Sequence, residues 1–124
     1  AWLDAAVAEH GLEAPLVAVG FSNGGMMAGA LAAVRPDLVG DVALLSSAYP
    51  LPAQTLAHGG LRGRRVLAAG GLEDPFLPRE TAVAGVASYR GAGADVTEAW
   101  RPGGHWIGPE EVAALAAWMR GGAG

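Results

Sequence analysis

The stretch Pro15–Gly25, with the sequence PLVAVGFSNGG, decides how this chain is interpreted. Its first seven residues form a continuous apolar run with two valines, which is typical of a strand buried on both faces in a parallel sheet. Apolar residues then recur at helical spacing from Met26 to Val34, and Arg35 followed by proline ends that pattern. The stretch therefore predicts a strand that passes into a helix within a few residues, with a serine in the turn between them.

Gly20 to Gly24 matches the pattern G-x-S-x-G in the strand-turn-helix context where that pattern presents a nucleophile. We expect Ser22 to be exposed on a strained turn, and we expect side chains at Gly20 and Gly24 to clash with the adjoining helix and strand. The Asn23 backbone N–H falls at the helix N-terminus, where negative charge is stabilised. The alternative interpretation is a glycine-rich turn that happens to contain a serine.

The alternation of strands and helices continues along the chain. Further strands are predicted at residues 41–45, 65–69 and 94–100, and helices at 2–10, 78–90 and 109–120. The last helix aligns four apolar residues on one face, namely Val112, Leu115, Ala116 and Met119. Four buried strands with interleaved helices predict an open parallel α/β sheet in a single, partial domain that comprises residues 1–124.

Composition narrows the function classes. The chain of 124 residues is 52% hydrophobic and 16% charged, which is typical of a core-forming globular protein. Its net charge is -4, and the three clustered arginines, Arg62, Arg64 and Arg65, are too few to indicate nucleic-acid binding. No apolar run approaches the roughly 20 residues of a membrane span, and no signal-peptide pattern is present, so we expect a cytoplasmic protein. Zero cysteines exclude thiolate metal sites and a cysteine nucleophile.

The beginning of the sequence suggests a piece of a longer protein. The first residue is Ala1 rather than methionine, and the helical pattern starts without an N-cap residue ahead of it. We therefore expect a fragment or a processed product.

A serine nucleophile needs a base and an orienting carboxylate, which in such a sheet lie at the carboxyl ends of strands. Asp41 and Asp95 stand at the beginnings of predicted strands, on the opposite edge. Glu73 and Asp74 directly follow the third predicted strand, and Asp74 is preferred because Pro75 fixes the turn after it. Glu73 as the acid, and Asp74 as a plain Asp-Pro turn residue, stay open as alternatives.

Among the three histidines, only His105 follows a predicted strand at its carboxyl end. His10 lies at a helix end, where it favourably faces the helix dipole, and His58 lies in the long connection of residues 48–63. The order of Ser22, Asp74 and His105 along the chain is the order found in α/β-hydrolases. A turn histidine without function is the alternative for His105.

These motifs resemble those in the C-terminal half of the phospholipase/carboxylesterase group of α/β-hydrolases, and they are similar to those of dienelactone-hydrolase-like proteins. The resemblance covers the whole chain and rests on residues 20–25, 35–38, 70–78, 103–105 and 109–112 and on Trp118. It implies an α/β-hydrolase-like parallel sheet with flanking helices. It also implies a carboxylesterase without metal or organic cofactor, acting on a small-molecule ester through an acyl-serine intermediate.

The resemblance also implies a role for each residue. Ser22 would attack the ester, His105 would move the proton, Asp74 would hold the imidazole, and the Asn23 N–H would be an oxyanion donor. From their position alone, Tyr49, Pro50 and Leu51 are expected to line a pocket for the acyl group.

One departure from the family is evident. Members of this fold normally have further N-terminal strands and a His-Gly-rich loop that supplies a second oxyanion donor, and nothing in this sequence corresponds to them. The strand at residues 15–21 would then be an apolar edge that favours association, including homo-oligomers. The alternatives to an esterase are another acyl hydrolase, an acyltransferase, or a truncated fragment without activity.

Overall fold

Four parallel strands and three helices make up the part of the chain that the computed structural model describes, which comprises residues 5, 8–9, 16–35, 37–51 and 60–122. The strands lie side by side in chain order, β1 (Leu16–Phe21), β2 (Val39–Leu45), β3 (Arg65–Gly71) and β4 (Asp95–Arg101). The helices are α2 (Asn23–Val34), α4 (Arg79–Gly91) and α5 (Pro109–Gly122). The parallel sheet with flanking helices that the sequence predicts is confirmed.

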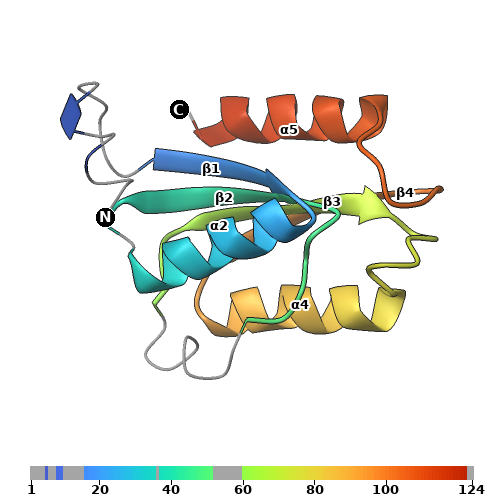
Figure 1. Ribbon diagram of the computed structural model, residues 1–124, viewed down its shortest axis with the longest axis horizontal. Coiled ribbons are helices and arrows are strands. Elements are labelled where there is room, and N and C mark those ends of the chain that lie inside the picture. Colours follow the sequence, from blue (N-terminus) through green and yellow to red (C-terminus); the bar gives the residue numbers. More distant parts are fainter. Residues whose placement is uncertain (1–4, 6–7, 10–15, 36, 52–59, 123–124) are drawn as a thin grey trace.

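The helices cover the two faces of the sheet, as Figure 1 shows: α5 lies over one face, and α2 and α4 lie on the other. Under α5, Trp118 packs on Leu45 and Leu67 of the two central strands. On the opposite face, Tyr89 of α4 packs with the core residues of α2 and the strands. Helix predictions at residues 78–90 and 109–120 are confirmed, whereas most of the helix expected at 2–10 lies outside the described residues.

The strand at the sheet edge departs from the expectation of burial on both faces. β2 and β3 are buried almost throughout, but in β1 the side chains of Val17 and Val19 are 49% and 47% exposed. β1 pairs only with β2 within the described residues. The apolar run is typical of a buried strand. Within the described part of the chain, however, β1 has no second neighbouring strand, and no element packs over the face that carries Val17 and Val19.

Small residues, rather than the large apolar ones, face the sheet from α2. The buried residues of this helix are Gly25, Ala28, Gly29 and Ala32. Large apolar residues that recur at helical spacing, among them Met27 and Val34, are exposed. The spacing predicts the helix correctly, but α2 is apolar all round, so periodicity alone does not reveal its inner face.

The inner face of α5 also differs from the expected apolar stripe. Glu111 and Trp118 are buried and Leu115 is half-buried, whereas Val112 and Met119 are exposed. The Arg65 guanidinium lies over the Trp118 ring, 4.5 Å from its centroid.

Among the described residues, no helix combines the length and the apolar character needed to cross a membrane.

Candidate active site

Ser22 occupies the turn between β1 and α2 in a backbone conformation that residues other than glycine seldom adopt. Its φ is 56° and its ψ is -121°, and its N–H donates to the carbonyl of Leu45 on the neighbouring strand. Such strain persists only where the surrounding structure holds it in place. The strained turn predicted for Ser22 is therefore present.

Glycines around Ser22 allow the strand and the helix to approach closely. A Cβ at Gly20 would overlap the backbone of Gly24 and Gly25, so no larger residue fits at Gly20. At Gly24, by contrast, an added Cβ would meet no atom within 4 Å, and the expected clash there is wrong. The second constrained position is Gly25, where a Cβ would overlap the hydroxyl of Ser47 and lie 2.9 Å from the carbonyl oxygen of Gly20.

Asp74 lies in the loop after β3 with its side chain fully buried. Its Oδ1 accepts hydrogen bonds from the backbone N–H groups of Phe76, at 2.8 Å, and Leu77, at 3.1 Å. Its Oδ2 lies 2.6 Å from Nδ1 of His105. The turn role and the histidine contact are therefore not alternatives, because one carboxylate oxygen serves each.

His105 connects Asp74 with Ser22. Its Nε2 lies 3.0 Å from Oγ of Ser22, across 83 positions of sequence. With the Nδ1 proton donated to Asp74, Nε2 accepts a hydrogen bond from the Ser22 hydroxyl. The imidazole lies close to two aromatic rings, with centroids 4.9 Å away at Phe21 and 5.0 Å away at Phe76. This contiguous arrangement can transfer a proton away from a serine hydroxyl.

The loop that carries His105 is held by Arg101, a residue that sequence reasoning missed. The Arg101 guanidinium donates to the carbonyls of Pro102, at 3.0 Å, and Trp106, at 2.6 Å, and it lies 4.7 Å from the centroid of the Trp106 ring. Its Nε donates to the carboxylate of Glu111. Arg101 ends a strand that contains several polar residues, so no local pattern marks it, and its burial depends on contact with Glu111 of α5.

The acid loop and the histidine loop are joined by backbone contacts. The Leu72 N–H donates to the Arg101 carbonyl at 2.7 Å, and the Glu73 N–H donates to the Gly103 carbonyl at 2.9 Å. A Cβ at Gly71 would overlap the carbonyl oxygen of Gly103, so a glycine is needed where the two loops cross. The carboxylate of Glu73 accepts from the Gly103 N–H at 2.8 Å, so Glu73 braces the histidine loop.

The remaining predicted residues lie around this arrangement. Asn23 is the first residue of α2, where a backbone N–H has no acceptor within the helix. Tyr49 donates through its hydroxyl to the Phe76 carbonyl at 2.9 Å. Burial raises the pKa of Tyr49, and the negative charge of Asp74 raises it further. Pro50 is exposed and Leu51 is packed in the core, so Tyr49 is the member of this group nearest the acid loop.

Two predictions concern residues without a described placement, because His10 and His58 lie outside the described residues. Within the ranges that are described, no three His, Asp or Glu side chains cluster closely enough to hold a metal ion.

Comparison with solved structures places the fold among carboxylesterases. The Bacillus cereus carboxylesterase superposes with a TM-score of 0.80 at 26% identity over 96% of this chain and 56% of its own. The Mesorhizobium loti carboxylesterase superposes with a TM-score of 0.79 at 26% identity, and the match covers 97% of this chain and 56% of that protein. A phospholipase/carboxylesterase from Dyadobacter fermentans superposes with a TM-score of 0.69 at 21% identity, and the match covers 94% of this chain and 57% of that protein. At this identity the similarity shows a shared fold and nothing further. Neither the family models nor the curated proteins compared with the chain match it.

The structural neighbours confirm the expected resemblance to carboxylesterases of the α/β-hydrolase fold. The chain spans a little over half the length of these neighbours.

Proposed function

We propose that this chain carries the catalytic residues of a serine hydrolase that cleaves carboxylic esters through an acyl-serine intermediate. The observation that carries the proposal is the continuous series of contacts from Asp74 to His105 to Ser22, at 2.6 and 3.0 Å. The carboxylesterase neighbours support the class of substrate. Under this proposal, residues 1–124 act together as one partial catalytic domain.

The reaction follows from the position of each atom. Oγ of Ser22 attacks the carbonyl carbon of the ester while its proton passes to Nε2 of His105, 3.0 Å away. Asp74 stabilises the imidazolium through Nδ1, and His105 then donates the proton to the departing alkoxide. Water then attacks the acyl-serine while its proton passes to His105. His105 returns a proton to Oγ of Ser22, which releases the acid and restores the free hydroxyl.

The oxyanion of the tetrahedral intermediate needs hydrogen-bond donors. The Asn23 N–H is positioned next to Ser22 at the start of α2, where the helix dipole favours negative charge. Among the described residues, we assign no second hydrogen-bond donor to the oxyanion. Because the absence of one donor typically reduces turnover by roughly 10²–10³, we expect slow hydrolysis by this chain alone.

Two measurements test the proposal. The chain is incubated with p-nitrophenyl acetate or butyrate, and separately with a fluorophosphonate probe followed by mass spectrometry. We expect probe attachment at Ser22 and turnover that Ser22→Ala abolishes.

Ser88→Ala is the matched control. It removes a half-buried hydroxyl from α4 whose partners, among the residues that the structure describes, are the backbone of Leu51 and of Gly85, so it should leave labelling and turnover intact. Equal turnover by Ser22→Ala and the unaltered chain would contradict the proposal. Folded protein that the probe never labels at Ser22 would identify an inert fragment instead.

A further inference from the structure

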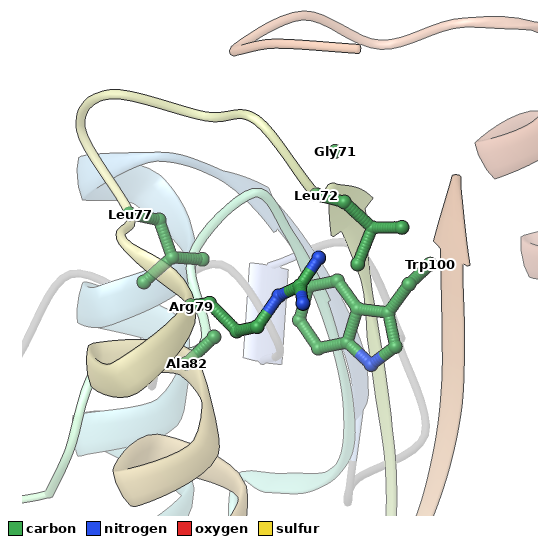
Figure 2. Close-up of a pocket in the computed structure, with 6 residues that line it drawn as sticks. All are labelled: Gly71, Leu72, Leu77, Arg79, Ala82 and Trp100. Carbon is green, nitrogen blue, oxygen red and sulfur yellow. The ribbon is translucent and has the colours of Figure 1, made fainter. Parts of the chain in front are cut away.

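A small cavity lies beside the loop that carries Asp74, separate from Ser22 and His105. It has a volume of about 160 Å³ and opens at the carboxyl ends of β3 and β4, next to the start of α4. Six residues line it, as Figure 2 shows, namely Gly71, Leu72, Leu77, Arg79, Ala82 and Trp100. None of them takes part in the contacts between Asp74, His105 and Ser22.

The walls of this cavity are mainly apolar. Leu72, Leu77 and Ala82 contribute aliphatic surface, and Trp100 contributes its indole. The indole N–H already donates to Oε1 of Glu98 at 2.9 Å, so Trp100 has no free donor to offer a ligand. An apolar cavity of roughly 150 Å³ holds a molecule the size of benzene. The space therefore suits one aromatic ring or a short alkyl chain.

Arg79 gives the same cavity one positive charge. Its side chain extends from the start of α4 towards the Trp100 indole (Figure 2), and it forms no hydrogen bond or ion pair with any described residue. As the first residue of α4, it also stands at the positive end of the helix dipole. A cation next to apolar walls can bind a ligand that has an anionic group at one end.

Glu98, whose carboxylate accepts the Trp100 indole N–H, is already paired with another cation. Glu98 forms an ion pair with Arg90 at 3.0 Å and accepts the Trp100 N–H. The hydrogen bond from Trp100 and the charge of Arg90 lower the pKa of Glu98. Its charge is thus committed to Arg90, and Arg79 stays available to a ligand.

We propose that this cavity binds a small monocarboxylate, with a ring or short alkyl chain against Leu72, Leu77 and Trp100, and with its carboxylate on Arg79. Leu72 and Leu77 lie at the two ends of the loop that carries Asp74, and the Leu77 N–H donates to Asp74 itself. An occupant therefore contacts the loop without touching Ser22. Binding does not depend on the proposed hydrolysis.

Benzoate is the probe, and benzyl alcohol is its uncharged analogue. Binding is followed by the indole N–H resonance of Trp100, assigned with Trp100→Phe, and by calorimetry. For a ligand of this size we expect benzoate to bind with a Kd on the order of 1 mM. Arg79→Gln should raise the Kd for benzoate about tenfold and leave weak binding of benzyl alcohol nearly unchanged.

Arg62→Gln is the matched control, since Arg62 is exposed and lies near Gly93, before the amino end of β4 and at the opposite edge of the sheet. Ala82→Leu fills the cavity and should abolish binding in protein that circular dichroism shows to be folded. Ser22→Ala should bind benzoate as the unaltered chain does, which separates this proposal from the proposed hydrolysis. The proposal is overturned if the Trp100 resonance does not shift with benzoate, or if Arg79→Gln weakens binding no more than Arg62→Gln.

Discussion

Arg101 and Glu111 form a buried ion pair between the last residue of β4 and the first turn of α5, with side chains only 6% and 1% exposed. The same guanidinium donates to the Pro102 and Trp106 carbonyls on either side of His105. Burial of two charges costs about as much as their attraction returns, so the pair contributes little net stability. Its consequence is positional, because it fixes the loop from which His105 reaches Ser22.

Arg101→Met should therefore separate stability from positioning. The substitution leaves the Glu111 carboxylate buried without its partner, and we expect the free energy of unfolding, measured in urea, to fall by about 3–5 kcal/mol. Replacing both Arg101 and Glu111 by methionine should restore much of that stability. Ester turnover should stay low in this double variant, because the carbonyls beside His105 have lost their donor. Full turnover in the double variant would show that Arg101 does not position the loop.

Asp74→Asn tests which acid orients His105. The asparagine can still accept the N–H bonds of Phe76 and Leu77, so the loop should keep its shape, but a neutral amide cannot stabilise the imidazolium. We expect kcat for p-nitrophenyl esters to fall by roughly 10³–10⁴. Glu73→Gln is the matched control, since its amide oxygen can still accept from the Gly103 N–H. If Glu73→Gln is as damaging as Asp74→Asn, the acid has been misassigned.

Gly20→Ala and Gly24→Ala should differ sharply, although both glycines belong to the same motif. The methyl at residue 20 overlaps backbone atoms, which cannot move aside as the end of a side chain can, whereas the methyl at residue 24 meets nothing within 4 Å. We expect Gly20→Ala to lower the thermal midpoint and the extent of fluorophosphonate labelling. Gly24→Ala should leave both nearly unchanged, and comparable damage from the two changes would contradict this account of the turn.

Tyr89 should make the fold sensitive to alkali. Burial raises the pKa of Tyr89 to about 12 from its ordinary value of 10.0. The unfolded state therefore loses this proton first, and stability that is intact below pH 10 declines as the pH rises towards 12. The loss should be on the order of 2 kcal/mol at pH 12.

In Tyr89→Phe, the free energy of unfolding should fall less steeply between pH 10 and pH 12, as measured by urea unfolding across this pH range. The chain has no lysine and only one other tyrosine, so Tyr49→Phe is the matched control. A decline of the same steepness in Tyr89→Phe would assign the alkaline loss to another group.

Much of the architecture could be predicted from the sequence because its signals are local. Apolar runs predict β2 and β3, helical spacing predicts α4 and α5, and glycines and prolines mark the turns. The positions of Ser22, Asp74 and His105 after β1, β3 and β4 followed from the same signals, because parallel strands end at one edge of the sheet. Their catalytic roles stay predictions.

The faces of the elements could not be predicted in the same way. α2 turns its small residues to the sheet, and β1 has an exposed face, because burial is decided by neighbours that a local pattern does not identify. The constraint at Gly25 depends on Ser47 from the next strand end, and the burial of Arg101 depends on Glu111 from α5. Both contacts join segments that only folding brings together.

The sequence by itself determined the order of strands and helices and placed a serine, an acid and a histidine at one edge of the sheet, since chain periodicity and turn residues act over a few positions. Only the tertiary structure decided that Asp74 divides its two oxygens between its own loop and His105, that Glu73 braces the neighbouring loop, and that Arg101 holds both sides of His105. The contacts of Asp74 with His105 and of Glu73 with Gly103 bring atoms 31 and 30 positions apart to within 3 Å, and such distances are set by packing rather than by sequence pattern. Arg101 is in turn held by Glu111, 10 positions further along the chain.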